Sequence, residues 1–302
     1  MLDAAVVNFN PASLLVLNAI LALLMFGVSL NLKPTDFTRV IKKPIAPIIG
    51  LVCQFVLLPA LTYSLTMLLD VPAGMALGMI LVSSCPGGVF SNVMTFLGRG
   101  NVATSITVTA TSSLAAVFMT PINFSFYAWL NPNTRHLLAE VNMDIFAVFT
   151  IVLLVLGLPL LLGMWIGVKF PNLASKSVAP MRTLSLLIFL SFVALAFINN
   201  LSLFAQYWHV FMWLVVLHNG LALLTGNLAA RLFRLPAADQ RALTFEVGIQ
   251  NSGLGLVLLF TFMPHLGGAL VITAFWGVWH LVSGVALALF WSKRELNREQ
   301  QI

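Results

Sequence analysis

The sequence predicts an all-helical polytopic membrane protein with nine membrane-spanning helices, its N-terminus outside and its C-terminus inside. Three observations support this fold class. The 302 residues are 60% hydrophobic and only 8% charged, whereas soluble domains carry about 25% charged residues. Nine apolar runs are long enough to cross a bilayer, and the basic residues gather in alternate loops.

The nine apolar runs each reach the length of about 20 helical residues that crosses the hydrocarbon core. They are too long and continuous for barrel strands, and unpaired backbone groups are costly in lipid, so we expect helices. The loops leave no room for a soluble domain, and residues 1–302 form a single transmembrane domain. The expected spans are residues 12–31, 44–69, 72–97, 102–130, 144–168, 183–204, 207–232, 241–263 and 266–291.

The basic side chains test the number of spans independently, because Lys and Arg accumulate in cytoplasmic loops. With nine spans, only Arg135 of the 15 basic residues falls on the opposite side. The net charge of +6 reflects this asymmetry, so we expect no nucleic-acid partner. The basic residues on the inner side are Lys33, Arg39, Lys42, Lys43, Arg99, Lys169, Lys176, Arg182, Arg231, Arg234, Arg241, Lys293, Arg294 and Arg298.

The N-terminal segment does not resemble a cleavable signal peptide, because it carries Asp3, no basic region and no small-residue cleavage site. Cys53 and Cys85 fall inside expected spans, where we expect small packing residues and not a disulfide or zinc site. We expect the protein to lie in the lipid bilayer of the cell membrane, the inner membrane if the source is a bacterium. No obligate protein partner is implied.

One carboxylate falls well inside an expected span. An ionisable group in the bilayer costs about 2.5 to 3.5 kcal/mol on insertion scales and usually marks function. Glu246 lies in the run TFEVGIQNSGLGL, four residues from Gln250 and so on the same helix face. The other acidic residues lie at span ends or in loops. A buried, hydrogen-bonded acid with a structural role is the alternative interpretation.

The third and eighth expected spans are interrupted near their centres. In the first, SSCPGGVFSN, Pro86 lacks an N–H donor and the pair Gly87-Gly88 adds backbone freedom. We expect breaks near residues 86–88 and 247–253. Irregular backbone at membrane depth survives where it lines a cavity or is buried in protein, and paired interrupted spans indicate a transporter binding site. The two spans run in opposite directions, as an inverted repeat requires.

The polar groups in these and neighbouring spans are oxygen donors, which hard cations such as Na⁺ prefer. Ser105 and Thr109 are four residues apart on one face, and Gln54 is an isolated amide in an apolar span. Broken helices add free carbonyls, and their N-termini suit an anionic substrate. Hydroxyls that bond their own helix and a structural amide are the alternative interpretations.

Five motifs taken together resemble the bile acid:sodium symporter family. In chain order they are LNLKPTDF, SSCPGG with SN, VVLHNG, EVGIQNSGL, and VWH with SG. The resemblance covers nearly the whole chain. It implies inverted repeats whose two broken helices cross in a core domain, packed against a panel domain. The chain resembles ten-helix bacterial members without their first helix, as in the nine-helix members of animals.

The resemblance implies two bound Na⁺ ions. The ligands implied for the first ion are Ser91, Asn92, Ser105, Thr109 and Glu246. The ligands implied for the second ion are the side chains of Gln54, Glu246 and Gln250 and the backbone carbonyls of Val247 and Ile249.

The resemblance also implies a substrate site beside the crossing, for which the sequence differs from the family pattern. Val89-Phe90 replaces a smaller, more polar pair, and Leu281 stands where Asn is expected. The substrate class therefore stays open between a bile-acid-like anion and a small carboxylate such as pantoate. The implied substrate residues are Gly88, Val89, Phe90, Asn251 and His280.

The expected function is sodium-coupled symport of a small organic anion by alternating access. A proton-coupled transporter that uses Glu246 as its titrating group is the alternative, and it would ignore Na⁺. A channel would line a pore with rings of polar groups, whereas here they cluster at one depth. An enzyme would need a nucleophile with its base or a second acid, so we expect no enzymatic activity. A receptor would bind without flux.

Overall fold

The structure is a computed structural model that describes residues 11–30, 32–33, 44–141 and 144–293. Regular structure in these residues is helical, and the one bridge of strand type joins Gly87 to Gln250. The helices are α1 (Pro11–Ser29), α3 (Ile45–Val52), η2 (Cys53–Leu57), α4 (Leu58–Leu68), α5 (Ala73–Ser84), α6 (Phe90–Leu97), α7 (Val102–Leu130), α8 (Pro132–Val141), α9 (Ile145–Val152), η3 (Leu153–Gly157), α10 (Leu158–Lys169), α11 (Pro171–Asn199), α12 (Leu201–Leu232), α13 (Ala237–Gly248), α14 (Ser252–Phe262) and α15 (Gly267–Ser292).

Five helices within the described residues are long and apolar enough to cross a membrane. Shorter apolar helices cover Leu14–Ser29, Ala73–Ser84 and Ser252–Phe262. Helices that are apolar on all sides are typical of buried or membrane-spanning segments. The five membrane-length helices are Ile45–Leu68, Val102–Leu130, Ile145–Lys169, Phe204–Leu232 and Gly267–Ser292.

Some boundaries differ from the expected ones. Helix α11 begins at Pro171, well before the expected span at 183–204, and the chain turns between α11 and α12 at Asn200. The short helix α8 was not expected, and it follows α7 directly. Several basic residues of the charge argument lie outside the described residues, namely Arg39, Lys42, Lys43, Arg294 and Arg298, and so does Asp3 of the N-terminal segment. The number of crossings and their orientation stay predictions.

Two pairs of helices are separated by short non-helical segments that lie near residues 86–88 and 247–253. Helix α5 ends at Ser84 and α6 begins at Phe90, and helix α13 ends at Gly248 and α14 begins at Ser252. At the first break Pro86 cannot continue the hydrogen-bond ladder. The four half-helices are packed among α7, α12 and α15, so their irregular backbone is buried in protein.

A π-helical turn, η2, interrupts the helix that carries Gln54. Pro59 follows this turn and lacks the N–H that would bond the carbonyl of Phe55. That carbonyl instead accepts a hydrogen bond from Asn123 Nδ2 of α7 at 2.8 Å. The Gln54 side chain lies within the π turn and is fully buried. Such turns often occur at functional sites.

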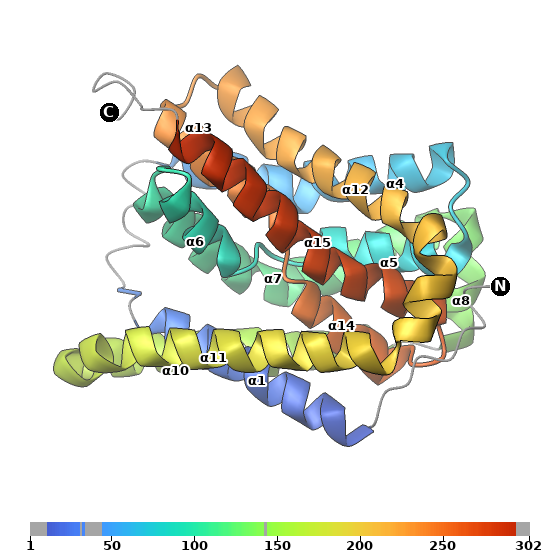
Figure 1. Cartoon of the computed structure of the whole chain (residues 1–302), viewed down its shortest axis with the longest axis horizontal. Helices are drawn as coiled ribbons and strands as arrows, with labels where there is room; N and C mark the ends of the chain where they lie inside the picture. Colours follow the sequence, from blue (N-terminus) through green and yellow to red (C-terminus); the bar gives the residue numbers. More distant parts are fainter. Residues whose placement is uncertain (1–10, 31, 34–43, 142–143, 294–302) are drawn as a thin grey trace.

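Helices α1, α10 and α11 lie side by side along one edge of the molecule, below the other helices in the view of Figure 1. Helix α1 contacts both α10 and α11, and it also contacts the half-helix α14. At that contact the two helices approach closely, since a Cβ atom on Gly253 would lie 2.6 Å from Leu21 Cδ2. The group formed by α1, α10 and α11 therefore contacts the remaining helices beside the second break, between α13 and α14.

Candidate functional site

The two breaks cross and bond each other. The Gly88 N–H donates to the carbonyl of Ile249 at 2.6 Å, and the Asn251 N–H donates to the carbonyl of Pro86 at 2.9 Å. These bonds flank the Gly87–Gln250 bridge. Buried backbone groups must be paired, and here each broken helix supplies partners that the other lacks. These backbone hydrogen bonds hold the two breaks in place relative to each other.

The last carbonyls of α13 each find a different donor. Val247 O accepts from Gln250 Nε2 at 2.7 Å, and Ile249 O accepts from the Gly88 N–H. Gly248 O accepts from Asn219 Nδ2 of α12 at 2.8 Å. Helix ends leave such carbonyls without intrahelical partners. The three carbonyls at this break therefore accept hydrogen bonds from the side chain of Gln250, from the backbone of the other break and from the side chain of Asn219 in α12.

The Glu246 carboxylate lies at the centre of the first predicted sodium group. It is fully buried, and its Oε2 accepts from Ser91 Oγ at 2.6 Å and from Thr109 Oγ1 at 2.8 Å. Its Oε1 has no hydrogen-bond partner among the described residues. A buried carboxylate oxygen without a donor is expensive. The first group therefore fits a cation, which would satisfy that oxygen.

The other two members of the first group lie beside these hydroxyls. Ser105 is fully buried, and its hydroxyl accepts from Thr95 Oγ1 at 3.2 Å. Asn92 Oδ1 accepts from Thr109 Oγ1 at 3.4 Å, a long contact that competes with the shorter bond to the carboxylate. The structure thus brings together all five residues predicted for this group, from α6, α7 and α13. Thr95 is an additional member of the network that the sequence did not indicate.

A polar contact at the start of α7 sets the register of α7 against α13. Asn101 caps α7 by accepting from the backbone N–H groups of Ala103 and Thr104. Asn101 Nδ2 and Thr104 Oγ1 both donate to Asp239 Oδ1 of α13, at 2.8 and 2.7 Å. This contact holds the α7 hydroxyls opposite Glu246 seven residues further along α13.

The second predicted sodium group is brought together but does not fit an ion in this arrangement. Gln54 Nε2 donates to Gln250 Oε1 and to Cys85 O, each at 2.6 Å. Gln250 Nε2 donates to Gln54 Oε1 at 3.2 Å and to Val247 O. The oxygens that would bind an ion therefore face amide N–H groups. The bonds to the two backbone carbonyls fix the orientation of both amides.

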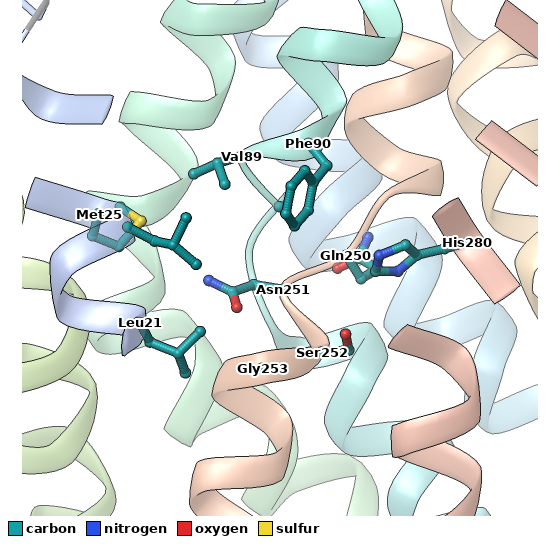
Figure 2. A pocket seen from close by; sticks show the side chains of 11 residues that line it. Leu21, Met25, Val89, Phe90, Gln250, Asn251, Ser252, Gly253 and His280 are labelled. Atoms are coloured by element: carbon teal, nitrogen blue, oxygen red, sulfur yellow. The ribbon is translucent and has the colours of Figure 1, made fainter. Parts of the chain in front are cut away.

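A small cavity of about 30 Å³ lies beside the crossing, between α1 and α15. Figure 2 shows the Asn251 side chain pointing toward α1 and the His280 ring on the other side, near Gln250. His280 is buried, and its Nδ1 has no hydrogen-bond partner in the described structure. All five residues predicted for the substrate site line this cavity, together with Leu21, Leu24, Met25, Gln250, Ser252 and Gly253.

The three departures from the family pattern have different surroundings. Val89 and Phe90 line the cavity, so their apolar side chains change its surface. Leu281 does not line it, and packs instead against a cluster that contains Met94, Phe245 and Ile249. At position 281, an apolar side chain that packs in the core therefore stands where the family pattern has a polar one.

The sequence analysis assigned no role to two buried amides that bond backbone carbonyls near the site. Asn219 bonds Gly248 O, and Asn123 bonds the π-helical turn beside Gln54. The signal that singled out Gln54, an amide in an apolar span, was present for both. Thr120 is a similar case, because its hydroxyl donates to Ser84 O at the end of α5 at 2.8 Å.

Comparison with known proteins gives consistent relatives. Residues 18–207 match the profile of the Sodium Bile acid symporter family. The chain is 34% identical to the uncharacterized sodium-dependent transporter YocS of Bacillus subtilis, over 92% of this chain and 84% of that protein. It is 30% identical to the probable sodium/metabolite cotransporter BASS1, chloroplastic, of Arabidopsis thaliana, over 90% and 66%. It is 26% identical to the human ileal sodium/bile acid cotransporter, over 85% and 74%.

The family match covers more than half of the chain, and the named relatives are all transporters. The resemblance inferred from the motifs is therefore confirmed. With its apolar helices, the protein is a multi-pass membrane transporter and not an enzyme. The chain belongs to the Sodium Bile acid symporter family.

Proposed function

We propose that this protein is a secondary active transporter that couples the entry of Na⁺ to the uptake of a small organic anion. The observation that carries the proposal is the buried Glu246 carboxylate, with two hydroxyl donors on Oε2 and, in the described residues, no donor on Oε1. Relatives named as sodium-dependent transporters or cotransporters support the same ion.

The first group would hold the ion through oxygens of Ser91, Asn92, Ser105, Thr109 and Glu246. These hydroxyl, amide and carboxylate oxygens are ligands that a hard cation prefers, and soft metals would require other side chains. Two hydroxyls donate to Oε2 of the Glu246 carboxylate, which leaves Oε1, without a donor in the described residues, to contact a cation. An ion here would contact α6, α7 and α13 together, and so would stabilise their packing.

A second ion at Gln54, Glu246, Val247, Ile249 and Gln250 stays a proposal that requires the amides to turn. In this arrangement the Gln250 amide donates to both Gln54 and Val247, and no transport step is derived through the second group.

The proposed substrate site is the cavity lined by Gly88, Val89, Phe90, Asn251 and His280. Apolar side chains of α1, Val89 and Phe90 suit the carbon skeleton of an anion. The Asn251 amide and the His280 ring offer polar contacts for its charged end. A bile-acid-like anion and a small carboxylate such as pantoate are both consistent with this lining.

We propose alternating access between two domains. Space of about 30 Å³ holds water but no organic anion, so the cavity must widen to bind one. It lies where α1 meets the crossing, which supports movement of a panel domain of α1, the helix Ile145–Lys169 and α11 against a core domain of the remaining helices. The proposal includes nine spans in inverted repeats, an outer N-terminus, an inner C-terminus and a location in the cell membrane.

The melting temperature of detergent-purified protein tests the ion directly. We compare Na⁺ with K⁺ and choline at fixed ionic strength and pH. A ligand that binds only the folded state stabilises it by RT ln(1 + [L]/Kd), so Na⁺ should raise the melting temperature and K⁺ should not. A protein that responds to pH but does not distinguish Na⁺ from K⁺ would instead support the proton-coupled alternative.

Thr109→Val should weaken sodium binding while preserving the fold. Valine keeps the shape of threonine but cannot donate to Glu246 Oε2, a bond of 2.8 Å. Hydrogen bonds to charged groups contribute about 1.5 to 3 kcal/mol, so the sodium concentration for half-maximal stabilisation should rise by about tenfold or more. The matched control is Thr107→Val, because the Thr107 hydroxyl donates to the Ala103 carbonyl of its own helix and not to Glu246. Equal sodium responses in the two variants would contradict the role of Thr109.

A further inference from the structure

We propose that Asn219 of α12 is a positioning residue that fixes the end of the Glu246 half-helix and ties it to the helix that carries His280. This inference rests on the proposed function and adds to it a residue outside both ligand groups. It is drawn from the hydrogen bonds of one buried amide and from the place of its two partners in the fold.

The amide of Asn219 is buried, with 1% of its surface exposed, and both ends are bonded. Its Nδ2 donates to Gly248 O at 2.8 Å, and its Oδ1 accepts from Ser283 Oγ at 2.6 Å. A backbone carbonyl can only accept, so the first bond fixes which end of the amide is nitrogen. One side chain therefore joins α12 to both α13 and α15.

The bond to Gly248 is the external support of the second break. The neighbouring carbonyls of Val247 and Ile249 accept from Gln250 and Gly88, which belong to the two breaks themselves. Of these three carbonyls, the one of Gly248 accepts its bond from a helix outside the crossing. Helix α12 also approaches closely here, since a Cβ atom on Gly248 would lie 2.7 Å from Leu223 Cγ.

The two partners of Asn219 belong to the two proposed sites. Gly248 lies two residues after Glu246, and Ser283 lies three residues after His280, whose ring lines the cavity. Loss of the amide would release the end of α13 and one turn of α15 at the same time. Coupling between ion and substrate requires that both favour the same arrangement, and this amide holds parts of both sites in one arrangement.

The experiment compares Asn219→Leu with Asn227→Leu in the purified full-length protein. Asn227 lies on the same helix and donates to Thr244 Oγ1 of the same partner helix at 3.1 Å, away from the break. Both variants should lower the melting temperature in K⁺. Only Asn219→Leu should raise the sodium concentration for half-maximal stabilisation, by about tenfold, the factor expected for one buried hydrogen bond. Asn227→Leu should stay within about twofold of wild type.

Ser283→Ala provides a milder variant in case Asn219→Leu does not fold. It removes the bond from Ser283 to the amide oxygen of Asn219 and leaves the bond to Gly248 in place. We expect a shift of about threefold in the same direction, together with faster hydrogen exchange of the backbone N–H groups of Gly88 and Asn251.

The inference is overturned if the folded variants at Asn219 and Ser283 keep the sodium response of wild type, because a merely structural amide changes only the baseline melting temperature. A wild-type protein that does not respond to Na⁺ would contradict the proposed function itself, and the inference falls with it. The two failures are distinguished by whether wild type or only the variants behave unexpectedly.

Discussion

Glu246→Gln should abolish sodium-dependent stabilisation and sodium-driven uptake while leaving a folded protein. The substitution keeps the shape of the side chain and an oxygen that can accept from Ser91 and Thr109, but removes the charge that attracts the cation. Removing one partner of a buried charge pair costs about 2 to 5 kcal/mol. The sodium affinity should therefore fall by about 30-fold or more.

The melting temperature measured in K⁺, without Na⁺, serves as an internal control for this variant. Without Na⁺, wild type buries a carboxylate oxygen that has no donor within the described structure, whereas the neutral amide avoids a buried charge. In K⁺ the melting temperature of Glu246→Gln should therefore equal or exceed that of wild type. A lower melting temperature in K⁺, with an intact rise in Na⁺, would assign Glu246 a structural role.

Gly87→Ala should have the largest effect on stability. A Cβ atom at this position would meet Glu246 Oε1 and would lie 2.8 Å from Glu246 Cδ and 3.0 Å from the Glu246 carbonyl oxygen. The bonds between the two breaks hold both backbones here, so neither can withdraw. Overpacking of this kind costs about 1 to 3 kcal/mol. We expect a lower melting temperature and the loss of the sodium response, measured by thermal unfolding in Na⁺ and K⁺.

Gly220→Ala is the matched control for this substitution. Gly220 lies within α12, and apart from its chain neighbours and the backbone of its own helix, no heavy atom of the described residues lies within 4 Å of an added Cβ. Alanine in a helix interior is favoured over glycine by about 0.5 to 1 kcal/mol, so the melting temperature should stay the same or rise. If Gly87→Ala behaves like Gly220→Ala, the close approach of the two breaks is not required for the fold.

The chemistry of the site could be predicted from the sequence because its parts violate the composition of a membrane helix. A carboxylate, an isolated amide and a Pro-Gly-Gly run are rare at membrane depth, so each one indicates a special role. The helices are interrupted at Cys85–Val89 and Ile249–Asn251, within or beside the segments where breaks were expected. The long apolar runs of the sequence likewise predicted the approximate ends of the membrane-length helices. The family motifs then supplied the grouping of residues.

The pairing of residues could not be predicted, since it depends on how the helices pack in three dimensions. Nothing in the chain indicates that the amides of Gln54 and Gln250 bond each other in place of an ion. The π-helical turn at Cys53–Leu57 depends on a proline and on Asn123 from another helix. Asn219 lies in the motif VVLHNG, but its role follows from the positions of Gly248 and Ser283 in the fold.

The central claim is that the Glu246 group binds Na⁺, and equilibrium binding of radioactive sodium to the purified protein tests it most directly. We predict saturable binding to wild type that unlabelled Na⁺ displaces and K⁺ does not, and the loss of that binding in Glu246→Gln. Binding that K⁺ displaces equally well, or that persists unchanged in Glu246→Gln, would contradict the assignment of this group as the sodium site.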